Sequence, residues 1–277
     1  MAAALLALGA SIAWGVGDYA GGLKSRVLPA LTVLAASQPF GLAALAVAVA
    51  ARGSGPPGAE VAWAALSALL GTIGLVAFYR GMAVGAMSVV APIAAAAAAI
   101  PVVWGVLAGE SLSLTQTVGI GAALAGGITA SLERHPERTR LATGTGWAVL
   151  AMLCFGAYYV PMHAAASHDW LWPTFLFRCT SVPLVWGAAL ARRSPPRGVR
   201  PHLGVLAAIG ILDTGGNVLF AAAAAAHGLL SVVSVLGSLY PVVTVLLARL
   251  LLGERVQRTQ DVGVLVALAG VVLVTAG

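Results

Sequence analysis

The chain is poor in charged residues and in cysteine. Only 9% of its 277 residues are Asp, Glu, Lys or Arg, whereas 60% are hydrophobic. A soluble domain carries roughly 25% charged residues, so this composition does not suit the surface of a water-soluble globule of this length. The two cysteines, Cys154 and Cys179, lie inside apolar runs and lack metal-site spacing. The composition excludes a soluble enzyme, a disordered chain and a fibrous chain, and it predicts an α-helical membrane protein.

Motifs of soluble enzymes are also missing from the sequence. It has no Walker lysine, no zinc-ligand spacing and no G-x-S-x-G elbow. The stretch GVGDYA (Gly15 to Ala20) matches the dinucleotide fingerprint, but no predicted strand precedes it. The net charge of +6 comes from basic residues between apolar runs, which indicates membrane orientation rather than nucleic-acid binding. We therefore predict no enzyme activity, no catalytic residue, no metal, no cofactor and no nucleic-acid partner.

Apolar runs, in contrast, fill most of the chain. A helix that spans a bilayer takes about 20 apolar residues, and runs of this length alternate here with short polar links. The predicted spans are 2–22, 30–51, 59–80, 84–107, 113–132, 143–163, 171–191, 203–225, 228–251 and 259–276. The sequence thus predicts an all-α membrane protein with ten transmembrane helices in a lipid bilayer and no separate soluble domain.

Short patterns recur at a nearly constant distance along the chain. GAMSVV at 85–90 resembles GLLSVV at 228–233, so Ser88 corresponds to Ser231. GESLSLTQTVG at 109–119 resembles GERVQRTQDVG at 253–263, so Glu110 corresponds to Glu254. Both offsets are close to half the length of the chain, and self-similarity at a fixed period indicates repetition of a structural unit. We therefore predict two copies of one five-helix unit.

The two predicted units are residues 1–138 and residues 139–277. Near their starts, AWGVGDY at 13–19 aligns with CFGAYYV at 154–160, which again lies about half the chain further on. Because each unit has an odd number of helices, consecutive copies cross the membrane in opposite directions. Many secondary transporters have such inverted repeats, with a substrate site near the midplane between the halves.

Basic residues are distributed unequally between the two predicted sides of the membrane. Arg52 is the one basic residue in a link after an even-numbered span. The links after odd-numbered spans carry Lys24, Arg26, Arg80, Arg134, Arg138, Arg140, Arg192, Arg193, Arg197, Arg200, Arg249, Arg255 and Arg258. Since Lys and Arg gather in cytoplasmic loops, we predict that the odd-numbered links are cytoplasmic and that both termini are extracytoplasmic.

The segment SLYPVVTVLLARLLLGERVQRTQDVG (238–263) resembles the helix, Leu-Gly-Glu turn and helix of the drug/metabolite transporter superfamily, within it the EamA-type proteins. WGVGDYAGG (14–22) is similar to the start of that family's first helix. Arg178 matches an Arg of the second helix of a repeat, and Gln38 stands at the counterpart position. The resemblance covers essentially the whole chain.

The resemblance implies a ten-helix carrier of the bacterial cytoplasmic membrane, often an exporter. Members of the family handle amino acids, sugars, nucleotide sugars and cationic drugs, so the resemblance does not identify a substrate. The first unit departs from the pattern because Ala97 replaces an expected proline, with Pro92 and Pro101 nearby.

Two ionisable residues lie in the middle of predicted spans, where such residues are costly and usually functional. Asp213 shares a helix face with Asn217 and Phe220. It would bind a cationic group, carry a proton or pair with Arg178. Arg178 in turn needs a carboxylate partner or an anionic substrate. We prefer the Arg178–Asp213 ion pair, which would also serve as a gate.

Asp18 lies late in the first span, shortly before Lys24 and Arg26. We prefer its pairing with these cations at the membrane interface over contact with a substrate. Aromatic residues that face a cavity would stack on an aromatic or cationic substrate. The aromatic candidates are Trp14, Tyr79, Trp104, Tyr158, Tyr159 and Tyr240.

The spans 84–107 and 228–251 combine small residues with proline. Small residues favour close helix packing, whereas proline kinks a helix, so these spans act either as packing elements or as hinges and cavity walls. The predicted substrate-binding or coupling residues are Asp213, Asn217, Arg178, Asp18, Tyr79, Trp104, Tyr158, Tyr240, Ser234 and Ser238.

These features together predict a secondary transporter of small organic metabolites or drugs that works by alternating access. We expect export rather than import, and we expect proton exchange at Asp213 as a coupling step. Amino acids or organic cations are suitable substrates. The expected partners are the substrate, protons and lipid, with the chain a monomer or a homodimer. The alternative is an uncoupled facilitator or obligate exchanger of the same fold. An intramembrane enzyme or an assembly subunit is the least favoured interpretation.

Overall fold

The computed structural model describes residues 1–25, 27–53, 58, 60–84, 93–131, 141–193, 198–252 and 258–276. Every regular element in these ranges is helical, which confirms the all-α prediction for this part of the chain. The elements are α1 (Ala2–Ser25), α2 (Ala30–Arg52), α3 (Glu60–Val84), η1 (Ala96–Ala98), α5 (Ala99–Leu107), α6 (Leu114–Ser131), α7 (Leu141–Ala165), α8 (Leu171–Ala191), η3 (Arg200–His202), α9 (Leu203–Ala225), α10 (Leu230–Gly237), α11 (Tyr240–Leu252) and α12 (Arg258–Ala276).

Six helices of the described chain have the length and apolar character of membrane spans. They are α1, α2, α3, α7, α8 and α9, with α9 extended by the turn η3. Three further apolar segments are shorter and cover Ile93–Leu107, Leu230–Thr244 and Asp261–Ala276. The helices therefore support a multi-pass membrane protein. The predicted spans 113–132 and 259–276 correspond to α6 and α12, while 84–107 and 228–251 are irregular in their described parts.

The outer surface of the bundle is apolar, as a surface in contact with lipid has to be. Leu107, Leu114 and Leu250 are 80%, 81% and 76% exposed, respectively. In water, contiguous apolar surface of this kind is unfavourable and rare on a monomer. The exposed leucines thus agree with the low charge of the sequence.

Local sequence sets several helix ends. Ser113 and Gln116 form a capping box before α6, because the Gln116 N–H donates to Ser113 Oγ at 3.1 Å and the Ser113 N–H donates to Gln116 Oε1 at 3.0 Å. Gly53 ends α2 in the left-handed region at φ +68°, and its N–H donates to the Val49 carbonyl. A capping box and a left-handed glycine therefore set these two helix ends.

The span predicted at 228–251 is two helices rather than one. α10 ends at Gly237, Ser238 and Leu239 form a turn, and α11 begins at Tyr240. Pro241 lies in the first turn of α11, where its missing N–H is tolerated, whereas it would leave a continuous helix without one backbone hydrogen bond. The continuous helix predicted for this range is wrong for that reason.

The counterpart span, predicted at 84–107, is also irregular. Its described part contains the 3₁₀ turn η1 directly before α5. Residues 85–92 of the predicted span lie outside the described residues. Both irregular segments thus occupy corresponding positions in the two halves of the sequence.

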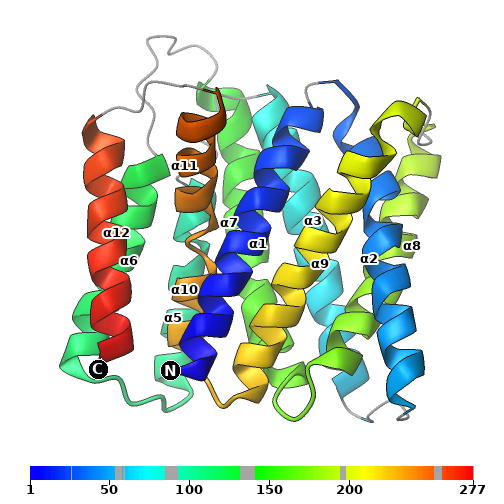
Figure 1. The fold of residues 1–277 in the computed structure, drawn as a ribbon. Helices are drawn as coiled ribbons and strands as arrows, with labels where there is room; N and C mark the ends of the chain where they lie inside the picture. The colour runs from blue at the N-terminus through cyan, green and yellow to red at the C-terminus, as the bar shows by residue number, and fades with distance from the viewer. Residues whose placement is uncertain are drawn as a thin grey trace.

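Helices from the two halves lie against each other in matching pairs (Figure 1). α3 packs against α7 as α1 packs against α9, and α6 packs against α12. The main chains of α6 and α12 approach each other closely at glycines of both helices. A Cβ added to Gly126 would lie 2.7 Å from the Gly263 carbonyl oxygen, and one added to Gly270 would lie 2.7 Å from the Gly119 carbonyl oxygen. Only glycine allows this approach of the main chains.

The start of α1 and the end of α12 lie at the same end of the bundle (Figure 1). α2 returns toward that end, where the link from α7 to α8 is also found. The main buried cluster includes Met162 of α7, Phe220 of α9 and Leu236 of α10. Tyr158, Tyr159 and Phe177 belong to the same cluster.

Candidate functional site

A cavity of about 70 Å³ lies between helices of both halves of the chain. One water molecule needs roughly 10–15 Å³ of such accessible volume, so the cavity has room for several. Its walls come from α1, α2, α3, α7, α8, α9 and α11. The lining residues are Trp14, Asp18, Gln38, Gly71, Thr72, Leu75, Phe155, Tyr158, Tyr159, Phe177, Arg178, Asp213, Asn217 and Tyr240.

An ion pair between α8 and α9 forms one wall of the cavity. Arg178 Nη2 donates to Asp213 Oδ2 at 2.7 Å, so the pair expected from the sequence is present. The Arg178 side chain is 1% exposed, whereas the Asp213 side chain is 26% exposed. An unpaired guanidinium at membrane depth would cost several kcal/mol, which the carboxylate offsets. Asp213 therefore holds Arg178 and still presents part of its carboxylate to the cavity.

A second polar contact lies one helical turn along α9. Tyr158 of α7 donates its hydroxyl hydrogen to Asn217 Oδ1 at 2.8 Å, and both residues line the cavity. Phe220, predicted on the same face, is instead fully buried in the main core cluster. The polar face of α9 thus runs from Asp213 to Asn217 and ends there.

Asp18 lines the cavity, which differs from the interface position preferred from the sequence. The Tyr79 hydroxyl donates to Asp18 Oδ1 at 3.5 Å. Lys24 Nζ lies 3.5 Å from His202 Nδ1 instead, and Arg26 lies outside the described residues. Six residues of helix separate Asp18 from Lys24 by about 9 Å, which explains why the carboxylate lies deeper than the cation.

The remaining predicted residues divide by their distance from the cavity. Tyr240 lines it, and no described residue hydrogen-bonds the Tyr240 hydroxyl. Tyr79 lies behind Asp18, while Ser234 and Ser238 are buried in and after α10. The Ser238 hydroxyl donates to the Val235 carbonyl at 2.9 Å. Tyr79, Ser234 and Ser238 therefore support the walls rather than form them.

Trp104 has no place in the cavity lining. It is 55% exposed on α5, on the apolar outer surface. The tryptophan that lines the cavity is instead Trp14 of α1. Apolar composition on all sides of a membrane helix hides which side faces lipid, so hydropathy does not distinguish Trp104 from Trp14.

Aromatic rings surround the polar groups of the cavity. The ring centroids of Trp14 and Tyr158 are 6.4 Å apart, those of Tyr158 and Tyr159 are 5.3 Å apart, and those of Tyr158 and Phe177 are 5.8 Å apart. All three contacts have the edge-to-face geometry that aromatic pairs prefer. The interlocked rings give the cavity a wall of fixed shape.

Sequence reasoning missed the lining residues of α3. These are Gly71, Thr72 and Leu75. A signal for them exists in the repeat, because Gly71 and Leu75 precede Asp213 and Asn217, two predicted site residues, by the offset that relates the two halves. Mapping predicted residues of one half onto the other half would have found this wall.

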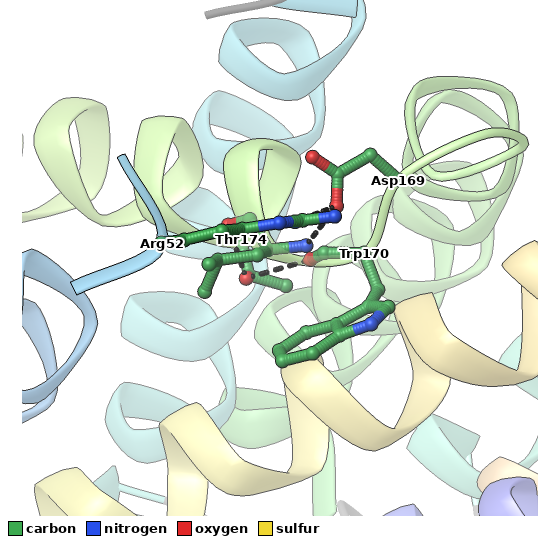
Figure 2. Close-up of polar contacts among 5 residues, drawn as sticks. Arg52, Asp169, Trp170 and Thr174 are labelled. Atoms are coloured by element: carbon green, nitrogen blue, oxygen red, sulfur yellow. Dashed lines mark hydrogen bonds and ion pairs between the residues drawn. The ribbon is translucent and has the colours of Figure 1, made fainter. Parts of the chain in front are cut away.

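Polar contacts also join the two halves near the end where α1 begins. Glu110 accepts hydrogen bonds from the N–H groups of Leu230 at 2.5 Å and Ser231 at 3.1 Å, and so caps the first turn of α10. Arg52 Nη1 contacts Asp169 Oδ1 at 2.6 Å (Figure 2). The same Asp169 oxygen accepts the Leu171 N–H at 2.9 Å, which caps α8. Each contact therefore fixes a helix end as well as joining the halves.

Comparison with known proteins gives a consistent result for the whole chain. The model of a family described as the EamA-like transporter family matches residues 1–132 and again residues 142–276. A solved structure described only as "Crystal structure of protein" is similar, with a TM-score of 0.79 and 17% sequence identity over 99% of this chain and 98% of that chain. At this identity the similarity shows the fold alone. No curated protein matches.

Proposed function

Because the chain belongs to the EamA-like transporter family, we propose that it is a secondary transporter of small organic metabolites or drugs. The observation that carries the proposal is the cavity between the two halves, where Asp18, Arg178 and Asp213 line the same space. Charged residues inside membrane helices mark substrate and ion pathways. Substrate sites of many carriers lie between repeats in this way. The family is one of transporters, which argues against an enzyme.

The proposed architecture has ten membrane spans in two inverted five-helix repeats, residues 1–138 and 139–277. The family model matches each half separately, which supports the duplication. The glycine contacts support it as well. A Cβ on Gly15 would lie 2.8 Å from the Tyr240 carbonyl oxygen, and one on Gly156 would lie 2.5 Å from the Ala97 carbonyl oxygen. These two contacts are related by nearly the same sequence offset as the repeats.

We place the transporter in the bacterial cytoplasmic membrane, with both termini on the extracytoplasmic side. The main support is the excess of Lys and Arg in alternate links. Arg52 is the one basic residue in the opposite links, where it pairs with Asp169 (Figure 2). The start of α1 and the end of α12 at one end of the bundle agree with an even number of spans.

Transport by alternating access would require the two halves to separate at one end and close at the other. Beside the closely packed helix pairs, single polar contacts join the halves at the two ends of the bundle, where such a movement would break or form them. Glu110 binds the start of α10 at one end of the bundle, and Lys24 lies beside His202 at the other. The turn at Ser238–Leu239 divides α10 from α11 and provides a hinge in the cavity wall. We propose export as the physiological direction.

Proton exchange at Asp213 is the proposed coupling step, and an uncoupled facilitator or exchanger is the alternative. The test is uptake of a bound solute by purified protein in liposomes, with and without a pH gradient. A thermal-shift screen first identifies a solute that stabilises the folded protein. Coupling predicts accumulation only with the gradient, whereas equal uptake under both conditions supports the alternative.

A matched variant makes this test specific for the Arg178–Asp213 pair. The double substitution Arg178→Gln with Asp213→Asn removes the titratable carboxylate without leaving Arg178 unpaired. Coupling through Asp213 predicts that this variant equilibrates the solute but does not accumulate it. Accumulation at the wild-type ratio would place the coupling group elsewhere.

A further inference from the structure

Acidic side chains outnumber basic ones in the described lining of the cavity. Its described lining contains two carboxylates, Asp18 and Asp213, and one guanidinium, Arg178. Arg178 is 1% exposed and is bound to Asp213. The guanidinium therefore offers a ligand far less exposed surface than the Asp213 carboxylate does. An anion entering the cavity would meet carboxylate oxygens before it met the guanidinium.

Asp18 is the carboxyl group of the lining that the ion pair leaves without a cationic partner among the described residues. Among the described residues, its polar contact is the Tyr79 hydroxyl at 3.5 Å, and Lys24 is directed to His202. Charged groups at membrane depth pair with an opposite charge. A neutral hydroxyl at this distance does not supply one, so a cation in the cavity would find its counter-charge at Asp18.

Aromatic rings line the same space as Asp18. Trp14 lies four residues before Asp18 on α1, so the ring and the carboxylate share one face of that helix. Tyr158, Tyr159 and Tyr240, with Phe155 and Phe177, form the rest of the aromatic wall. Aromatic faces attract organic cations, because the negative face of the ring quadrupole points at the positive charge.

We propose that the cavity selects small organic cations, with the charged nitrogen at Asp18 and the apolar body against Trp14 and the tyrosines. This inference rests on the proposed transport function and names the substrate class of the same site. It assigns Asp18 as the residue that determines specificity, while Asp213 remains occupied with Arg178. Anions are disfavoured because the one guanidinium of the described lining is buried.

The test measures binding of three probes of similar shape to the purified protein in detergent. Benzyltrimethylammonium carries a fixed positive charge, benzyl alcohol is neutral and phenylacetate is negative. We expect the cation to bind at least about tenfold more tightly than the other two, which corresponds to roughly 1.4 kcal/mol. Equal binding of the three probes, tighter binding of either other probe, or no binding of the cation would overturn the proposal.

Variants locate the selectivity in the chain. Asp18→Asn should lower the affinity for benzyltrimethylammonium at least about tenfold, and Asp18→Glu should restore most of it. Glu60→Gln removes a carboxylate at the start of α3, outside the cavity lining, and should leave the affinity unchanged. Unchanged cation binding in Asp18→Asn would refute the role of Asp18. The probe ranking of the wild type tests the proposal even if this variant does not fold.

Liposome transport separates this inference from the transport function itself. Uptake of phenylacetate but not of benzyltrimethylammonium would leave the carrier in place and refute cation selectivity. Binding of the cation without transport of any probe would retain the cation site and contradict the carrier function. Selective uptake of the cation supports both.

Discussion

The two halves of the chain use similar helices but different side chains at the cavity. The second half contributes Arg178, Asp213 and Asn217. Gln38, Gly71 and Leu75 stand at the corresponding positions of the first half and line the same cavity. Positions that pack helices carry small residues in both halves, while the positions that face the cavity differ. The helix framework and the binding chemistry are therefore separable, and the following substitutions test that separation.

The largest effect is expected from breaking the ion pair of the second half. Removing one partner of a buried pair typically costs about 3–5 kcal/mol. Asp213→Asn leaves Arg178, which is 1% exposed, without its ion-pair partner, so the loss of stability should be near the upper limit. Arg178→Gln leaves Asp213, which is 26% exposed, without its ion-pair partner, so the loss of stability should be near the lower limit. Unfolding in detergent by heat or denaturant measures both losses.

The double variant Arg178→Gln with Asp213→Asn provides the control for the ion pair. It should be more stable than Asp213→Asn alone, because no unpaired charge remains in the cavity wall. A loss equal to the sum of the two single losses would mean that the groups do not interact. Such additivity would contradict the Arg178–Asp213 contact as an energetic unit.

Glycine substitutions test whether the framework is equivalent in the two halves. Gly15→Ala and Gly156→Ala should each destabilise the protein by about 1–3 kcal/mol, because the new Cβ has no space. Their Cβ atoms would approach Val243 Cβ and the Ala97 carbonyl oxygen, respectively, to 2.5 Å. Thermal unfolding of the two variants checks the prediction.

Each of these glycines has a matched control in its own helix. Gly22 in α1 and Gly146 in α7 have no heavy atom within 4 Å of an added Cβ. Gly22→Ala and Gly146→Ala should be neutral or stabilising by up to about 1 kcal/mol, because Ala is the better helix former. If Gly15→Ala and Gly156→Ala behaved like these controls, the close packing would not contribute to stability.

The smallest effect is expected at the Arg52–Asp169 contact. Arg52→Ala should cost less than about 1 kcal/mol, since exposed ion pairs contribute little. Asp169→Ala should cost more, because it also removes the acceptor for the Leu171 N–H at the start of α8. Equal losses, measured by thermal unfolding, would show that the cap adds nothing to the pair.

The sequence predicts long helices well and their interruptions poorly. The predicted spans 171–191 and 203–225 coincide with α8 and α9, because polar links bound their apolar runs. The apolar run 228–251 continues through the turn at Ser238–Leu239, so hydropathy does not register the break. Repeat length and charge distribution likewise predict two units and the direction of their spans, but they do not show how the two halves pack.

The sequence predicted the site best for charged residues in the middle of a span. Arg178 and Asp213 lie far from both ends of their spans, so burial requires them to pair. Asp18 was misplaced because the nearby Lys24 suggested an interface position, although more than one helical turn separates the two. Trp104 and Trp14 show that the rotation of an apolar helix about its axis is not encoded in hydropathy.

Counterflow in proteoliposomes tests the central claim most directly. Liposomes containing the purified protein are loaded with an excess of an unlabelled solute that stabilises it and are then diluted into the same solute at trace, labelled concentration. A carrier with one alternating site predicts transient accumulation of label above its equilibrium level. Uptake no greater than in protein-free liposomes, or uptake that never exceeds equilibrium, would contradict transport by alternating access.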